Sequence, residues 1–353
     1  MAIASNRLLG PLLKEVSRSF YLTLRVLPSR IRPQIGLAYL LARTTDTIAD
    51  TNAAPVQMRL EALRALQQRI LGSGSKKLDF GPLTAHQSKP AEKMLLQEHE
   101  SSLHLLGSLS VNDLALVREV LAVIISGQEL DLRRFFGSSG TNIMSLRTEE
   151  ELDDYTYRVA GCVGEFWTRI CRAHLFPKAS LDDKSLLREG VLFGKGLQLV
   201  NILRDVPVDL GLGRCYLPSV TLAERGLTPT NLLDPENEPR LRPIYETYLN
   251  QARDNLMAGW NYTHALPRRS IRVRLACAWP ILIGLQTINR LRRGNVLDVN
   301  QRIKISRRDV RQWMLRSVIY YPWPGRWRRL ADDAAGARRN PQSRTEGRRF
   351  PAP

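Results

Sequence analysis

Two stretches of the sequence place carboxylates beside polar side chains at helical spacing. In the first, Tyr39, Arg43, Asp46 and Asp50 follow one another at intervals of four, three and four residues. On a helix these intervals put all four side chains on one stripe. Taken alone, such an aspartate pair is typical of a solvated face with an ion pair. This stretch therefore indicates a functional site only if a second stretch with matching residues occurs elsewhere in the sequence.

A second stretch, residues 191–209, supplies that partner. Its polar residues are Gln198, Asn201, Asp205 and Asp209, at intervals of three, four and four, and its other positions are almost all apolar. A helix that is apolar on its remaining sides is buried rather than surface-lying. Because buried carboxylates need partners or a metal, we expect this stripe to face an internal polar cavity.

Two aspartate pairs on separate helices share a chemical use. Carboxylate oxygens without His or Cys nearby suit Mg²⁺, which proteins typically hold with one or two carboxylates together with substrate phosphates. The pattern predicts a di- or polyphosphate substrate, whose oxygens Arg18, Arg43 and Arg204 could bind as charge develops on the leaving diphosphate. A Gly-rich phosphate loop is missing from the sequence, which excludes the usual nucleotide-binding mode.

Composition narrows the class of partner. The 353 residues carry a formal net charge of +18, of which residues 264–320 contribute +11 (13 basic, 2 acidic) and residues 321–353 contribute +5 (8 basic, 3 acidic). This excess predicts an anionic partner. We expect no nucleic-acid partner, because zinc-finger spacing, a basic region with heptads and an aromatic sheet pattern are all missing. The four cysteines form no C-x-x-C pair, which argues against a structural zinc site.

Membrane-spanning segments are not expected. The N-terminus lacks the apolar core of a signal peptide. The longest apolar run, from Leu275 to Ile288, is interrupted by Pro280 and Gln286 and is shorter than the ~18–20 residues that a span requires. We therefore expect a cytoplasmic chain.

The polar stripes must be positioned by helices, because apolar residues recur at helical spacing almost throughout. Gly- and Pro-rich stretches at 72–82, 137–142, 211–213 and 228–239 separate expected helices of about 15–28 residues. We predict an all-α protein with one catalytic domain over residues 1–320. Residues 321–353 are rich in Pro, Gly and Arg, so we expect a basic and mostly disordered tail there.

Small residues interrupt a further expected helix at 155–164. Gly161 and Gly164 each cost a helix ~1 kcal/mol relative to Ala. They therefore indicate either close packing against another helix or a nearby ligand. The segment Gly127-Gln128-Glu129-Leu130-Asp131-Leu132, where polar groups end an apolar run, has the same two interpretations.

Together these stretches resemble the squalene/phytoene synthase family of head-to-head prenyl synthases, over roughly residues 14–320. The resemblance rests on these pieces, in chain order: Ser17-Arg18-Ser19-Phe20, Asp46-x-x-x-Asp50 after Arg43, Gly127-Gln128-x-x-Asp131-Leu132, Tyr155-x-Tyr157-x-Val159-Ala160-Gly161-x-x-Gly164, Gln198-x-x-Asn201-Ile202-x-Arg204-Asp205-x-x-x-Asp209 and Gly213-Arg214-x-Tyr216-Leu217-Pro218. One piece alone would be unspecific, whereas the combination is highly specific.

The resemblance implies an all-α isoprenoid-synthase fold with the two aspartate pairs facing each other across a central cavity. By the same resemblance Asp46, Asp50, Asp205 and Asp209 are catalytic and bind Mg²⁺, and the diphosphate is bound by Arg18, Ser19, Tyr39, Arg43, Gln198, Asn201 and Arg204. Tyr155 is then the candidate for handling a proton or stabilising a carbocation. Free carbocations react with water, so we expect apolar or aromatic walls, with Phe20, Phe166, Trp167 and Tyr157 as candidates.

The implied reaction removes diphosphate from one prenyl diphosphate and joins the cation to the double bond of a second, which forms a cyclopropyl intermediate. Squalene synthases then reduce this intermediate with NADPH, whereas phytoene and dehydrosqualene synthases lose a proton. Cys277-Ala-Trp-Pro280 resembles a squalene-synthase stretch, and Lys304 and Arg307 resemble its NADPH-phosphate segment. We therefore expect two farnesyl diphosphates to give squalene, with phytoene or dehydrosqualene synthase as the alternative.

Three departures from the family pattern bear on this expectation. Ala276 stands where an aromatic residue often precedes the cysteine, which weakens the case for reduction. Pro207 and Val208 interrupt the second aspartate pair, and Pro207 cannot donate to the carbonyl of Leu203, so the helix should kink there. We also expect no C-terminal membrane anchor of the kind found in the eukaryotic enzymes.

The basic C-terminal segment is a candidate replacement for that anchor. It interleaves Tyr320, Tyr321, Trp323 and Trp327 with arginines, a composition able to lie at an anionic membrane surface. An unbound solubilising tail is the other interpretation. With membrane contact, the enzyme would be peripheral to the inner face of the cell membrane.

Two other classes are less consistent with the sequence. A non-catalytic scaffold of the family would have lost the aspartates, and all four are present. A head-to-tail chain-elongating enzyme would need D-D-x-x-D, but Thr45 precedes Asp46.

Overall fold

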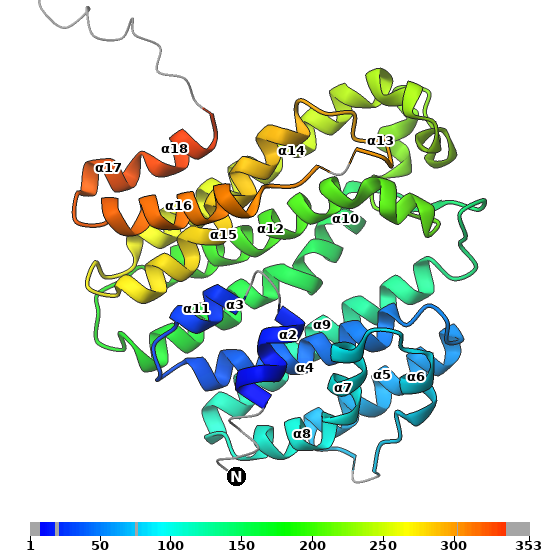
Figure 1. Cartoon of the computed structure of the whole chain (residues 1–353). Helices are drawn as coiled ribbons and strands as arrows, with labels where there is room; N and C mark the ends of the chain where they lie inside the picture. The colour runs from blue at the N-terminus through cyan, green and yellow to red at the C-terminus, as the bar shows by residue number, and fades with distance from the viewer. Residues whose placement is uncertain (1–7, 18–20, 75–76, 302, 337–353) are drawn as a thin grey trace, which may run out of the picture.

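The computed structural model describes residues 8–17, 21–74, 77–301 and 303–336. Over these residues the chain is almost entirely helical (Figure 1), which confirms the all-α class. Strands within them are confined to β1 and β2, which pair in parallel over two residues each. Arg18, Ser19 and Phe20 lie outside the described residues, so their expected roles stay predictions.

The elements follow in this order: η1 Leu8–Leu12, α2 Leu13–Ser17, α3 Tyr21–Val26, α4 Arg32–Asp50, α5 Val56–Leu71, α6 Gly81–His86, α7 Pro90–Gln97, α8 His99–Gly107, α9 Val111–Arg134, β1 Met144–Ser145, α10 Glu149–Thr156, η3 Tyr157–Gly161, α11 Cys162–His174, α12 Asp183–Gly211, β2 Arg214–Cys215, α13 Ser219–Ala223, η4 Pro229–Leu233, η5 Pro235–Asn237, α14 Glu238–Ala265, α15 Ile271–Leu291, α16 Arg307–Tyr320, α17 Pro324–Arg328 and α18 Leu330–Ala334. Of these, η1 and η3 are π-helical, and η4 and η5 are 3-10 helices.

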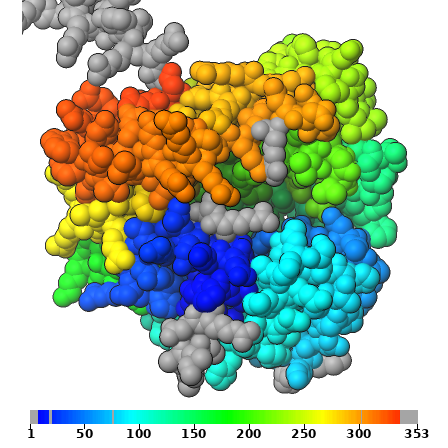
Figure 2. Space-filling view, viewed as in Figure 1, coloured from blue at the N-terminus to red at the C-terminus, as the bar shows by residue number. Residues whose placement is uncertain are grey.

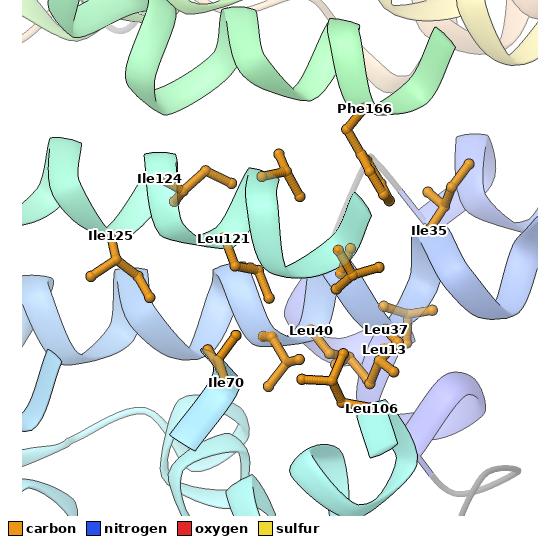
Figure 3. Close-up of a cluster of buried hydrophobic side chains, with 14 of the residues drawn as sticks. Leu13, Ile35, Leu37, Leu40, Ile70, Leu106, Leu121, Ile124, Ile125 and Phe166 are labelled. Atoms are coloured by element: carbon orange, nitrogen blue, oxygen red, sulfur yellow. The ribbon is translucent and has the colours of Figure 1, made fainter. Parts of the chain in front are cut away.

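One hydrophobic cluster holds the N-terminal half together. Leu121, Ile124 and Ile125 recur at helical spacing on α9 and pack against α4, with Ile70 of α5 and Leu106 of α8 in the same cluster (Figure 3). This packing fixes the face of α4 that is turned away from the core. That face carries the first polar stripe.

A second cluster joins α12, α14 and α15, the long helices that run side by side in the upper half of Figure 1. Leu203 of α12, Tyr245 of α14 and Leu282 of α15 are fully buried within it. Phe193 packs against both clusters, so α12 lies where they meet. A cavity between the clusters is therefore bordered by the faces of α4 and α12 that carry the two polar stripes.

Small residues bring η3 and α11 into backbone contact with α12. A Cβ on Gly164 would lie 1.8 Å from the carbonyl oxygen of Gly190, and one on Gly194 would lie 2.2 Å from that of Ala160. These distances leave no room for any side chain. The glycines of 155–164 thus serve close helix packing, and Gly164 also borders the cavity.

The expectation of a tail from residue 321 is wrong for residues 321–336. Residues 324–334 form α17 and α18, which pack on α15 and α16 (Figure 1). Trp327 is 2% exposed and stacks on Trp260 of α14. Large buried aromatics outweigh the helix-breaking composition that suggested a tail. Residues 337–353 lie outside the described part.

Among the described residues, one helix is apolar and long enough to cross a membrane. This is α15, and 72% of its apolar window is buried inside the protein. Burial of this kind is typical of the core helix of a folded domain.

Candidate active site

Two cavities adjoin between the N-terminal and C-terminal halves. One has a volume of about 350 Å³ and a mainly apolar wall. The other has a volume of about 230 Å³ and a mainly polar wall. Asp46 of α4, Gln198 of α12 and Val159 of η3 line both. The pair of cavities therefore suits a ligand with a polar head and an apolar tail.

The first polar stripe lies where its spacing predicted. Tyr39 and Asp46 line the apolar cavity, and Asp46 and Asp50 line the polar one. Arg43 is turned toward α7, where it donates a 2.6 Å hydrogen bond to Glu92, and it lies 3.8 Å from Asp46. Arg43 is thus held beside the cavity by a carboxylate that the sequence analysis did not single out.

The second stripe divides between different surroundings. Gln198 and Asn201 line the apolar cavity. Asp205 accepts hydrogen bonds from Nε and Nη2 of its neighbour Arg204, so the two side chains form an ion pair. Asp209 lines a small hollow together with Arg214 and Tyr216. The expectation that this stripe faces an internal polar cavity is correct for Gln198, which lines both cavities. Asn201 lines only the apolar cavity, and Asp205 and Asp209 line neither.

The wall of the apolar cavity contains one of the aromatics expected there. Trp167 lines it together with Phe193 and Tyr262. Phe166 is instead buried in the N-terminal cluster (Figure 3). Tyr157 faces away and donates a 3.2 Å hydrogen bond to Glu165. Along α11, neighbouring positions point in different directions, so only one of two adjacent aromatics reaches the cavity.

Residues distant in the sequence complete the polar cavity. Gln128 and Asp131 come from α9, and Arg214 and Tyr216 from the segment around β2. Gln128 donates to Asp46, and Tyr216 donates a 3.0 Å hydrogen bond to Asp131. The matching motif pieces contained these residues, but spacing along one helix could not assign them to the site.

Arg214 is placed in the site by the strand pair. In that pair Met144 of β1 lies opposite Arg214 of β2. The turn before it needs glycine at residue 213, where φ is +83° and a Cβ would lie 2.4 Å from the Ser139 backbone. The Arg214 guanidinium then lies 3.7 Å from Asp131.

Tyr155 lies inside the polar cavity. Its ring stacks on Tyr216 with centroids 4.7 Å apart and an interplanar angle of 24°. Burial, followed by the nearby Asp131 carboxylate, raises the pKa of Tyr155 well above its ordinary value. The phenol therefore stays protonated at neutral pH and is no base in this state.

The carboxylates of the site lie close enough to repel one another. Loss of hydration, followed by the charge of Asp50, raises the pKa of Asp46 to about 6. Loss of hydration also raises the pKa of Asp131 to about 6, and, with the charge of Asp205, that of Asp209 to about 7. Such a site favours an added cation, because a cation would relieve both effects.

The donor set fits Mg²⁺ bound together with a phosphate group. Buried oxygens Oε1 of Gln128 and Oδ1 of Asp131 have no hydrogen-bond partner. In the part of the chain that the structure describes, no three His, Cys, Asp or Glu side chains converge closely enough to hold a metal ion by themselves. Mg²⁺ commonly takes one or two carboxylates and completes its shell with water and substrate phosphates. Asp46 and Asp50 are placed for that role.

The residues expected to contact NADPH lie elsewhere. Neither Lys304 nor Arg307 lines either cavity. The Lys304 carbonyl accepts a hydrogen bond from Arg290, which follows Ala276 of the cavity wall by fourteen residues on α15. At a rise of about 1.5 Å per residue this is about 21 Å along the helix axis. The expected contact of these two residues with NADPH therefore stays a prediction, and we derive no reductive step through them.

Helix α12 is continuous past Pro207, as far as Gly211. The proline has no N–H to donate to the Leu203 carbonyl. The hydroxyl of Tyr245 on α14 donates to that carbonyl instead, at 2.8 Å. A residue of another helix thus satisfies the Leu203 carbonyl, which Pro207 leaves without a main-chain partner.

The fold and site together define an all-α protein in which carboxylates and arginines lie beside an apolar cavity. The sequence pattern of the squalene/phytoene synthase family matches residues 13–309. The chain therefore belongs to the squalene/phytoene synthase family, whose members are prenyltransferases that make head-to-head condensation products.

Curated relatives and solved structures are consistent with this membership. The bifunctional lycopene cyclase/phytoene synthase of Colletotrichum graminicola is 31% identical over 246 residues, which are 69% of this chain and 39% of that protein. The chain thus spans about two fifths of that relative's length. A squalene synthase in complex with a ligand, TcSQS, has a TM-score of 0.70 at 19% identity over 94% of this chain and 98% of that chain. A dehydrosqualene synthase in complex with a ligand has a TM-score of 0.62 at 22% identity over 91% and 95%. These structures share the all-α isoprenoid-synthase fold.

Proposed function

We propose that this chain condenses two molecules of a long-chain prenyl diphosphate head to head and releases the hydrocarbon without a reductive step, as a phytoene synthase does. The observation that carries the proposal is the junction of an apolar and a polar cavity at Asp46 and Gln198. The phytoene synthase relatives support this branch, and Lys304 and Arg307, the residues expected to bind NADPH, line neither cavity.

The polar cavity would hold the diphosphate. Mg²⁺ bound there with the substrate would supply charge stabilisation for the leaving diphosphate. Arg214 and Arg43 lie beside the carboxylates and can donate charge-assisted hydrogen bonds to phosphate oxygens. On substrate binding, Arg43 would release Glu92 and bind the diphosphate instead, since the carboxylate and the diphosphate are both anionic hydrogen-bond acceptors.

The apolar cavity would hold the prenyl chains and protect the cation. As the allylic C–O bond of the first substrate breaks, its electron pair leaves with the diphosphate, the double bond of the second substrate supplies the pair for the new C–C bond, and loss of one proton closes the cyclopropyl ring. The C–O bond to the second diphosphate then breaks in the same way, and loss of a second proton gives the hydrocarbon, with oxygens of the released diphosphates as the proton acceptors. The ring of Trp167 and the protonated Tyr155 offer negative π-faces to the cation. A neutral phenol cannot accept the final proton, so we assign Tyr155 to cation stabilisation and not to proton removal.

The test is to incubate the purified full chain with geranylgeranyl or farnesyl diphosphate and Mg²⁺, with and without NADPH, and to identify hydrocarbons by mass spectrometry. We expect phytoene from geranylgeranyl diphosphate without NADPH. Squalene from farnesyl diphosphate, formed only with NADPH, would overturn the proposed branch.

The scaffold alternative needs a separate control. Asp46→Asn keeps the shape of the side chain and removes its charge, so an enzyme should lose at least about a thousandfold in turnover. Asp254→Asn, at an exposed site on α14, should leave turnover unchanged. A wild-type chain without product from either substrate would favour the scaffold.

A further inference from the structure

The outer face of α16 and the turn into α17 expose apolar side chains that no described segment covers. Leu315, Val318, Ile319 and Trp323 are 60%, 49%, 49% and 52% exposed. The opposite face of α16 carries Trp313 and Ser317, which are buried against α15. Figure 2 shows this segment, in orange, on the surface turned to the viewer.

The same face is basic at its other end. Arg308 and Arg311 precede Leu315 by seven and four residues, so they continue its stripe. No ion pair within the described residues engages either arginine. The carboxylate of Asp309 already pairs with Arg290, and that of Asp333 with Arg316. The face therefore combines an apolar end with uncompensated positive charge.

Further positive charge lies behind this face. Arg274 of α15 is 5% exposed, and its guanidinium stacks over the rings of Tyr321 and Trp327. Within the described residues no carboxylate pairs with it. Arg268 donates to the carbonyl of Pro322 beside Trp323. Buried carboxylates therefore do not neutralise the positive potential of this surface.

We propose that the face formed by Leu315, Val318, Ile319, Trp323, Arg308 and Arg311 docks the protein on an anionic lipid bilayer. A helix with apolar and basic residues on one exposed face lies in the plane of the membrane interface, with its arginines at the headgroups. The inference rests on the proposed function in one respect, because prenyl substrates and hydrocarbon products reside in membranes. It also changes which residues are expected at the membrane surface. Trp327 and most of Tyr321 face inward, whereas Trp323 and the outer face of α16 are exposed.

The test measures sedimentation of the full chain with vesicles, without substrate. We expect binding to an equimolar mixture of phosphatidylcholine and phosphatidylglycerol, and little binding to phosphatidylcholine alone. The double variant Val318→Glu/Ile319→Glu should bind at least about tenfold more weakly. Arg308→Gln/Arg311→Gln should also lose about tenfold, and only on the anionic vesicles. Val111→Glu, at an exposed apolar residue on α9, is the matched control and should bind like the wild type.

Three results would overturn the proposal: no wild-type binding to anionic vesicles, equal binding to both vesicle types, or unchanged binding of the Val318→Glu/Ile319→Glu variant. Light scattering in the absence of lipid tests the rival occupant, a second copy of the chain. A dimer that this variant converts to a monomer with vesicle binding unchanged would assign the face to self-association. Condensation activity is measured separately in solution. A wild-type chain that is active but does not bind vesicles would overturn this inference alone. A chain that binds vesicles but is inactive would overturn the proposed function alone.

Discussion

The hydroxyl of Tyr245 donates a 2.8 Å hydrogen bond to the main-chain carbonyl of Leu203. This is the carbonyl that residue 207 would bond in an uninterrupted helix, and residue 207 is proline. Both Tyr245 and Leu203 are fully buried, so water cannot take the place of the hydroxyl. The bond therefore ties α14 to α12 at Leu203, two residues before Asp205.

Tyr245→Phe tests this relationship. Removing the hydroxyl leaves a buried carbonyl without a donor, which we expect to lower the free energy of unfolding by about 1–3 kcal/mol. Pro207→Ala restores a main-chain N–H that can serve the same carbonyl. The cost of Tyr245→Phe, measured by urea unfolding, should therefore be smaller in the Pro207→Ala background. Equal costs in both backgrounds would contradict the explanation.

Gly164→Ala should be much more disruptive than its size suggests. The added methyl group would lie 1.8 Å from the Gly190 carbonyl oxygen and force α11 away from α12, beside the apolar cavity. We expect a loss of about 3 kcal/mol or more in the free energy of unfolding, or a chain that does not fold. Gly107→Ala is the control, since no atom lies within 4 Å of its added Cβ. That variant should be neutral or more stable by up to about 1 kcal/mol.

Arg214→Gln tests a residue of the polar cavity that helical spacing alone did not assign to the site. The loss of one charge-assisted contact to the diphosphate should lower kcat/KM by about 10- to 100-fold. Arg253→Gln removes an arginine whose pairing is with the exposed Asp254 on α14. Its steady-state kinetics should match the wild type. Equal effects of the two changes would remove Arg214 from the site.

Metal and phosphate should bind cooperatively. Because no three metal-ligating side chains converge among the described residues, Mg²⁺ alone should shift the melting temperature little. Inorganic diphosphate can supply the remaining ligands, so Mg²⁺ with diphosphate should raise the melting temperature by several degrees. The shift should disappear in Asp50→Asn and on addition of a chelator. A full shift with Mg²⁺ alone would mean that the protein holds the ion without phosphate.

Asp113 should make the stability depend on pH. Burial favours its neutral form, but hydrogen bonds with His174 (2.7 Å) and Gln34 (3.1 Å) outweigh burial and lower its pKa. A lowered folded-state pKa means that the carboxylate stabilises the fold fully above about pH 4, the unfolded value, and less as the pH falls through the folded value. Asp113→Asn should therefore cost roughly 1–2 kcal/mol at pH 7 and less in acid. Unfolding curves at several pH values, with Asp254→Asn as the control, measure the difference.

Much of the site was predictable because its parts are local. Helical spacing places Asp46 and Asp50 on one face of α4, and Gln198 and Asn201 on one face of α12, whatever the helices pack against. Arg43 of the first stripe and Arg204, which adjoins the second, were predicted as phosphate ligands, yet they form ion pairs with Glu92 and Asp205. A residue pattern along one helix cannot predict which side chain of another helix will pair with a given arginine, or which rotamer that arginine adopts.

By itself, the sequence determined the all-α class and the two polar stripes, since both follow from the periodicity of a single helix. Tertiary structure alone decided that Asp131 and Arg214 join the polar cavity, and that Lys304 and Arg307 stay outside it. It also decided that Trp327 is buried while Trp323 is exposed. The physical reason is that these positions depend on how distant segments pack, and packing is settled by shape and burial summed over the whole core.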